Sequence, residues 1–170
     1  MTNKKTIQYD ALSVAKYLLS LDPNREYFGN KKMPNRSIIK GNFRLNQMLY
    51  LLQIFYHLKQ KKTLFSDNLY AWENGVIVYS VYTRFWELYL QKNGQDTNAI
   101  AKEDQKTIAT CFRYLKDIPD RVLQEFAYHD PAWSSTWAKS SQPEINFSGR
   151  ENLETYRQFC SRWLPEATRL

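Results

Sequence analysis

The side chains that most often carry out catalysis are few in this chain and stand far apart in the sequence. His57 and His129 are the only histidines, and Cys111 and Cys160 are the only cysteines. General acid–base or nucleophilic chemistry would need a base and an orienting partner beside such a residue, and neither is identifiable here. A zinc site would need these residue types at short, regular spacings. We therefore expect His57 to be a core or helix-end histidine and His129 to belong to a helix cap with Asp130.

Two carboxylate pairs are the other candidates for proton transfer. Glu103 and Asp104 are adjacent, and Asp117 and Asp120 are close in sequence, but carboxylates near helix ends commonly occur in this way. The glycine-rich phosphate loops and the nucleophile elbow are absent, and only five glycines are present from which a phosphate-binding loop could form. The sequence thus predicts no catalytic residue, no metal site and no cofactor, and we expect that the protein is not an enzyme.

Composition places the chain among ordinary globular proteins. Its 170 residues are 43% apolar and 24% charged, which suits a single domain over residues 1–170 with a proper core. No secretory segment is recognisable in the N-terminal sequence MTNKKTIQYD, and no apolar run approaches the length of a bilayer span. Two isolated cysteines at apolar helix positions fit a reducing compartment better than a disulfide framework. We expect a soluble, cytoplasmic protein that does not contact a membrane.

The elements that would position any site are mostly helices. The strongest helical pattern covers 43–60, where apolar residues occupy nearly every side, so we expect a buried helix at the centre of the fold. One-sided patterns predict further helices at 9–21, 79–91 and 103–117, a short one after Pro119, another after Asp130-Pro131, and a C-terminal one at 149–163. The expected fold class is mainly α: a single helical domain around the central helix, with a small β-hairpin.

Residues 64–78 are expected to form that hairpin. Asn74-Gly75 supplies the positive φ angles of a tight primed turn between two apolar segments. A two-stranded hairpin is marginally stable alone, so it must pack on helices. The favoured interpretation is that Trp72, Tyr79 and Tyr82 pin the hairpin onto the central helix. Alternatively, these rings shape a groove where a partner binds, as exposed Tyr and Trp often do.

Positive charge is concentrated in one part of the chain. Residues 25–62 carry a net charge of +8, whereas the whole chain carries +7. The basic segment 23–42 is predicted to be a long loop with a short helical turn at Ile38-Ile39. Its cations would attract an acidic protein or a nucleic acid at long range. Nucleic acid is the secondary candidate, because aromatic residues are not interleaved with the cations for base stacking. A solvated loop without a ligand is the alternative. The candidate cations are Lys31, Lys32, Arg36, Lys40 and Arg44.

Four motifs follow one another in the middle of the chain. They are Leu45-Asn46-Gln47-Met48-Leu49-Tyr50, then Leu64-Phe65, then Ala71-Trp72-Glu73-Asn74-Gly75-Val76-Ile77, then Val81-Tyr82 with Phe85. Their order resembles the pattern of the Panacea domain family, also described as SocA-like, and Glu103-Asp104 and His129-Asp130-Pro131 resemble its later landmarks. The family's proline after the turn glycine is Val76 here, and a lysine of its first motif is Gln47. The loop at 23–42 and the C-terminal helix have no clear counterpart in the family.

The resemblance implies a mostly helical domain with a small hairpin and an antitoxin role. Members of the family neutralise varied protein toxins by binding them, and many are carried by prophages. Our first hypothesis is therefore an antitoxin that occludes a toxin through the hairpin and the basic loop. The alternative is a phage-encoded counter-defence protein that binds a host nucleic-acid-handling complex. Direct DNA binding is disfavoured, because no helix-turn-helix with a polar recognition helix is found. The residues expected to contact the partner are Lys31, Lys32, Arg36, Lys40, Arg44, Trp72, Asn74, Tyr79 and Tyr82.

Overall fold

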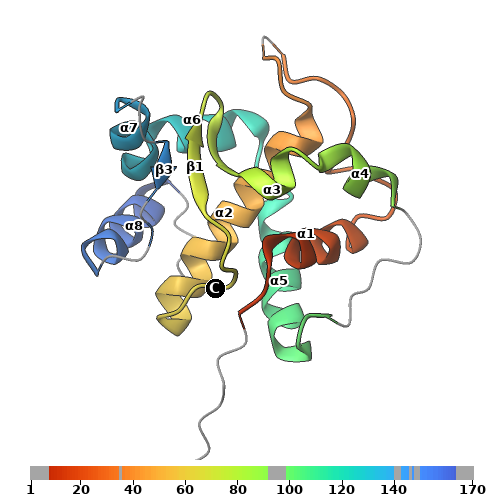
Figure 1. Ribbon diagram of the computed structural model, residues 1–170, viewed down its shortest axis with the longest axis horizontal. Coiled ribbons are helices and arrows are strands. Elements are labelled where there is room, and N and C mark those ends of the chain that lie inside the picture. Colours follow the sequence, from red (N-terminus) through yellow and green to blue (C-terminus); the bar gives the residue numbers. More distant parts are fainter. Residues whose placement is uncertain are drawn as a thin grey trace, which may run out of the picture.

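Helices around one central helix, with a small sheet on one side, make up the fold (Figure 1). The computed structural model describes residues 8–34, 36–91, 99–139, 143–145, 147 and 150–163. The helices are α1 (Ala11–Ser20), α2 (Lys40–Gln60), α3 (Tyr79–Tyr82), α4 (Phe85–Leu90), α5 (Lys102–Leu115), α6 (Asp120–His129), α7 (Pro131–Trp137) and α8 (Arg150–Trp163), and the strands are β1 (Leu69–Trp72), β2 (Gly75–Val78) and β3 (Glu144–Ile145). The predicted class, mainly α with a small β-hairpin, is confirmed.

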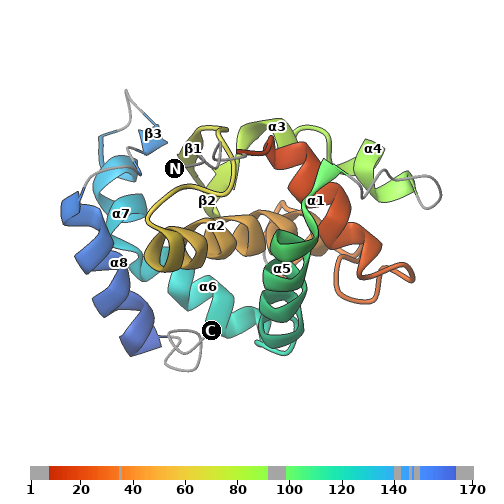
Figure 2. The same cartoon turned by 90° about the horizontal axis from the view of Figure 1, so that it is seen from below.

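The predicted central helix is α2, and it begins three residues earlier than the pattern suggested. Every residue from Leu45 to His57 is buried, because apolar side chains occupy all sides of the helix and neighbours cover each of them. Figure 2 shows α2 crossing the middle of the molecule, with α1 and α5 at one end and α7 and α8 at the other. The helix ends where Lys61 adopts a left-handed conformation and donates its backbone N–H to the His57 carbonyl.

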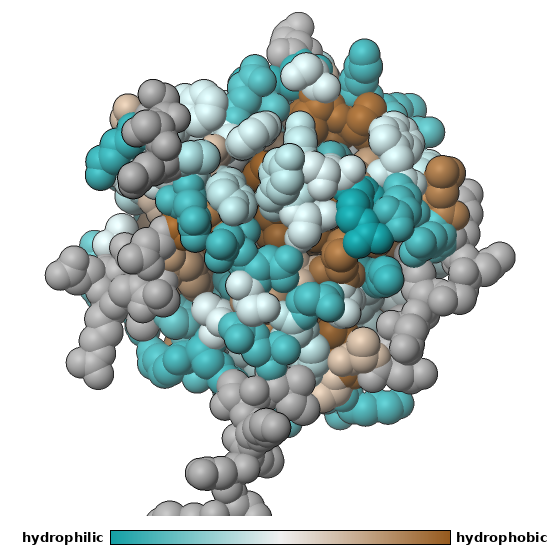
Figure 3. All heavy atoms as spheres, viewed as in Figure 1, coloured by the Kyte–Doolittle hydropathy of each residue, from teal (hydrophilic) through white to brown (hydrophobic). Residues whose placement is uncertain are grey.

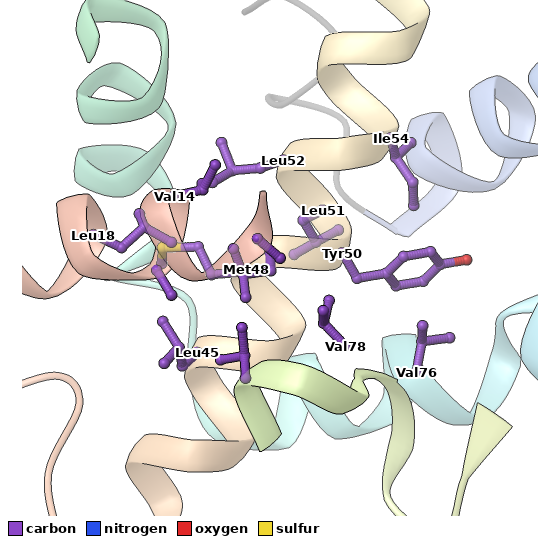
Figure 4. Close-up of a cluster of buried hydrophobic side chains, with 14 of the residues drawn as sticks. Val14, Leu18, Leu45, Met48, Tyr50, Leu51, Leu52, Ile54, Val76 and Val78 are labelled. Carbon is purple, nitrogen blue, oxygen red and sulfur yellow. The ribbon is translucent and has the colours of Figure 1, made fainter. Parts of the chain in front are cut away.

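The core forms on both sides of this helix. Figure 4 shows side chains of α2 directed toward Val14 and Leu18 of α1, and others directed toward Val76 and Val78 of β2. All four of these valine and leucine side chains are at most 1% exposed. The hairpin is therefore held on α2 mainly through the inward-facing residues of its second strand.

The sheet has the strand order β2-β1-β3, and both pairings are antiparallel. The predicted turn is displaced by one residue: Trp72 pairs with Gly75, so the turn between β1 and β2 is Glu73-Asn74. Of the predicted pair only Gly75, with φ +116°, has a positive φ, so the two positive φ angles of a primed turn are not formed. The outer edge of β2 is bonded by side chains of α2: Asn46 Oδ1 accepts from Val78 N at 2.9 Å, and Gln47 Nε2 donates to Val76 O at 3.4 Å. The strand β3 was not predicted, since two residues are too few for an alternating pattern to be recognised.

Two predictions about connecting segments are wrong. The expected helix at 79–91 is divided into α3 and α4, because Arg84 leaves the helical path, with φ −106° and ψ 15°. Ile38-Ile39 forms no helical turn; Ile39 bridges to Lys32 instead, and Met33 N donates to Ile38 O. The loop is thus closed by backbone pairing, which is a long-range contact that local sequence does not specify.

Candidate functional site

The outward side of the hairpin carries a group of exposed aromatic rings. Along β1, Leu69 and Ala71 are buried, whereas Tyr70 is half-buried and Trp72 is 37% exposed, as the alternation of a strand requires. Tyr79, at the start of α3, is 52% exposed. Ring centroids lie 6.1 Å apart for Tyr70 and Tyr79, 6.3 Å for Trp72 and Tyr79, and 6.4 Å for Trp72 and Tyr82. We call Tyr70, Trp72, Tyr79 and Tyr82 the aromatic face.

The structure corrects the favoured interpretation of these rings. Trp72 and Tyr79 do not pin the hairpin onto α2, because they point away from it; Tyr82 alone of the three is partly buried against the core. Asn74 lies apart from the aromatic face, since its side chain is turned inward and only 7% exposed. The aromatic face therefore comprises three of the residues expected to bind a partner, together with Tyr70, which the sequence did not single out.

Two hollows adjoin the aromatic face, and Pro143 lines both of them. The smaller, of about 420 Å³, lies between Trp72 and Trp137, with Ala71, Thr136 and Pro143 as its other lining residues. The larger, of about 780 Å³, extends past Tyr70. Trp137 is 47% exposed and stacks on Trp133, with ring centroids 5.8 Å apart. Nothing in the sequence indicated that α7 lies beside the hairpin.

Figure 3 shows the side of the molecule that carries the hairpin and α3. Strongly hydrophobic residues appear there in small separate areas, with pale and hydrophilic residues between them. Tyrosine and tryptophan combine a large apolar ring with a polar tip, so a surface built from them stays compatible with water until a partner covers it.

The five basic candidates do not form one free patch. Asp120 pairs with Lys40 Nζ at 2.8 Å and with Arg44 Nε at 2.7 Å. Partial burial alone would raise the pKa of Asp120, but hydrogen bonds from the two cations and their charge lower it below its usual value. Arg36 lies over the ring of Tyr128, with its guanidinium carbon 4.8 Å from the ring centroid. Arg44 makes further contacts with Tyr27, whose carbonyl it reaches at 2.8 Å.

Lys31 and Lys32 are the exposed members of the basic set, and no ion pair to them occurs in the described part of the chain. Lys40 and Arg44 serve to join the start of α2 to the start of α6. The charge that the loop offers to a partner is accordingly smaller than the sequence suggested.

A buried acid lies at the junction of α6 and α7. Asp130 is 0% exposed and caps α7 through its Oδ1, which accepts from Ala132 N at 3.1 Å; Pro131 then opens the helix, as predicted. Among the described residues, Asp130 Oδ2, Tyr50 OH and Tyr156 OH have no partner at hydrogen-bond geometry. Burial raises the pKa of Asp130 to about 6, against the opposing effect of two backbone N–H groups at the start of α7.

His57 and the two cysteines, which were the other candidates for chemistry, lie in the core of the fold. His57 is 8% exposed and lies beside the ring of Phe147, which confirms that it is a core histidine, and burial lowers its pKa. Cys111 and Cys160 are both buried free thiols. Within the described ranges, no three His, Cys, Asp or Glu side chains gather closely enough to hold a metal ion.

Comparisons with known proteins add little to this geometry. No family model and no solved structure matches the chain. A segment of the TRP-like ion channel pkd2 of Schizosaccharomyces pombe is 27% identical over 138 residues, which is 75% of this chain and 18% of the channel. The chain thus spans about a fifth of the length of that relative. None of the helices in the described ranges is long and apolar enough to cross a membrane. The resemblance to the Panacea family stays a prediction that rests on the motifs quoted above.

Proposed function

We propose that this chain is an antitoxin-type protein of the cytoplasm that neutralises a partner toxin by binding it directly. The single observation that carries the proposal is the aromatic face, where Trp72 of the hairpin and Tyr79 at the start of α3 remain substantially exposed. The proposal agrees with the family that the motifs of residues 45–85 resemble. In this role the chain occludes the toxin and needs no catalytic residue, metal or cofactor of its own.

The physical basis is the energetics of protein interfaces. Tyr and Trp are over-represented among the few residues that dominate binding, and truncating such a residue costs about 2 kcal/mol or more. A rigid support makes them more effective, because less conformational entropy is lost when the partner binds. Here β1 is paired on both sides, and the Trp72 carbonyl accepts a 2.7 Å hydrogen bond from Trp133 Nε1.

Lys31 and Lys32 have a secondary part in the proposal. Exposed charges chiefly raise the rate of association and add little affinity. Pairing of Lys40 and Arg44 with Asp120 reduces the positive charge that could follow a phosphate path. That reduction disfavours the alternative of a counter-defence protein directed at a nucleic-acid-handling complex.

The test is co-expression of the chain with the neighbouring gene, scoring growth rescue and co-purification. We expect rescue by the wild-type chain and its loss in the double variant Trp72→Ala/Tyr79→Ala, because the main contact rings are removed. Trp86→Ala is the matched control: Trp86 is also an exposed tryptophan, at 49%, but lies on α4 outside the aromatic face. Circular dichroism and thermal melting establish that each variant is folded.

The dose dependence of rescue separates occlusion from enzymatic inactivation of the toxin. Occlusion requires at least as much chain as toxin, whereas an enzyme would rescue growth at a small fraction of the toxin concentration. Rescue at strongly substoichiometric amounts, or equal loss of rescue in the Trp86→Ala control, would contradict the proposal.

A further inference from the structure

Aromatic and acidic side chains lie together on the outward side of the sheet. Tyr70 on β1 lies opposite Glu144 on β3, and residues paired across antiparallel strands project from the same side of the sheet. Glu144 is exposed, and so is Glu73 at the hairpin turn, next to Trp72. This side of the sheet thus combines aromatic rings with carboxylates.

The larger hollow has the same character. Among the described residues that line it, the charged ones are Asp67 and Glu144, and the others are neutral. Asp67 accepts hydrogen bonds from Ala11 N at 2.7 Å and from Ser80 Oγ at 2.8 Å, which fix the carboxylate without neutralising it. No ion pair to Asp67 or Glu144 is formed by any described residue. In a chain with a net charge of +7, a hollow whose charged residues in the described ranges are both acidic is a local reversal of sign.

The smaller hollow continues this surface with apolar walls. Pro143 lines both hollows; Asp67 and Glu144 line the one that contains Tyr70, and Trp72 and Trp137 line the other. Tyr70 and Trp72 are two residues apart on β1, which corresponds to about 7 Å along a strand. Side chains at positions i and i+2 of an extended peptide project to the same side with this same spacing.

We infer that the two adjoining hollows bind an extended, positively charged segment of a partner protein, with a Lys or Arg at the Tyr70 and Glu144 end and an apolar residue two positions away between Trp72 and Trp137. Charge complementarity selects the cation, since its ammonium or guanidinium group meets carboxylates while its aliphatic stem lies on aromatic rings. The indole walls of the smaller hollow carry no charge and accept an apolar side chain. The inference rests on the proposed function only in requiring that a protein supplies the segment.

The test uses a defined peptide and no toxin. The probe is Ac-Gly-Arg-Gly-Leu-Gly-NH2, titrated into the ¹⁵N-labelled chain while the tryptophan indole N–H signals are followed by NMR. The Trp72→Phe and Trp137→Phe variants assign the two indole signals that line the smaller hollow. We expect both signals to shift in a saturable manner while the Trp86 signal stays unchanged. The peptide with Glu in place of Arg should bind about five-fold or more weakly.

Variants of the chain with matched changes in net charge test where the Arg of the peptide binds. Glu144→Lys should weaken binding of the Arg peptide about five-fold or more, whereas Glu26→Lys, an exposed site that changes the net charge equally, should leave it within about two-fold. Glu144→Gln repeats the test with a smaller perturbation. Equal binding of the Arg and Glu peptides, equal effects of the two Lys variants, or no peptide-induced shift would overturn the inference. Concentration-dependent shifts without peptide would assign the surface to a second copy of the chain and overturn it too.

The peptide result is separable from the proposed function. If the neighbouring gene product is not a toxin, rescue fails while the peptide still binds at the two hollows. If the hollows do not take a cation, the charge variants leave peptide binding unchanged while rescue still depends on Trp72 and Tyr79.

Discussion

Replacing Asp130 by asparagine should stabilise the folded chain at neutral pH. Burial raises the pKa of Asp130 from 3.8 to about 6, so the native state binds this proton more tightly than the unfolded state does. Below about pH 4 both states are protonated and the group carries no penalty. As the pH rises toward 6 the native carboxyl must ionise, and none of the described cations pairs with it, so the free energy of unfolding falls.

The magnitude follows from the size of the shift. A change of about two units at about 1.4 kcal/mol each gives a penalty of roughly 3 kcal/mol above pH 6. Asparagine keeps the oxygen that caps α7 and cannot ionise, so Asp130→Asn should recover a large part of this energy. Its amide also brings donors that require partners, and the hydroxyls of Tyr50 and Tyr156 are available to accept from them. We expect a gain of about 1–3 kcal/mol at neutral pH.

Urea denaturation of both proteins, at about pH 4 and about pH 7.5, measures the effect. The difference between variant and wild type isolates Asp130 from the other titrating groups. It should be small in acid and reach its full value at neutral pH. Asp120→Asn is the control of opposite sign: the pKa of Asp120 is lowered by its cations, so this variant should lose stability at neutral pH. A pH-independent difference for Asp130→Asn, or a variant less stable at neutral pH, would refute the reasoning.

Three further predictions concern the fold. Neither cysteine should react with a thiol reagent in the native chain at neutral pH, because burial raises the pKa of Cys111 to about 11 and that of Cys160 to about 12; a chromogenic disulfide should label both only after unfolding. Gly75→Ala should destabilise by about 2 kcal/mol or more by chemical denaturation, because φ there is +116° and the added methyl would lie 2.9 Å from the Ala127 Cβ. Asp104→Ala should lower the free energy of unfolding by about 1–3 kcal/mol, since two tyrosine hydroxyls donate to that carboxylate at 2.6 and 3.1 Å.

The elements that could be predicted from the sequence are those determined by the residue pattern within the element itself. The central helix was recognisable because apolar residues surround it, and a helix of that kind is stable only when covered on every side. The place of the hairpin and the start of α7 were recognisable from Asn74-Gly75 and Asp130-Pro131, although the turn itself is one residue earlier, at Glu73-Asn74. In each case the signal lies within a few residues of the element that it specifies.

The parts that were not predicted depend on partners distant in sequence. Asp120 neutralises two cations that lie 76 and 80 residues before it, so counting charges along the chain overstated the free charge of the basic loop. Trp137 comes beside Trp72 only because α7 packs against β1. The strand β3 exists only through its pairing with β1. Such contacts produce no periodic pattern in the sequence. The candidate residues could therefore be identified by type, but which of them lie together in space could not be predicted.

The same long-range contacts explain why exposed rings can be supported by so short a hairpin. Two strands of four residues are marginal alone, and their unpaired backbone groups would fray in water. Here Asn46 and Gln47 bond the outer edge of β2, while Ala71 N donates to Pro143 O at 2.7 Å on the other side. Because both edges are bonded, the backbone beneath the aromatic face is fixed before any partner arrives. In the proposed role, a partner would have to order only side chains with two rotatable bonds each, so more of the contact energy would be retained as affinity.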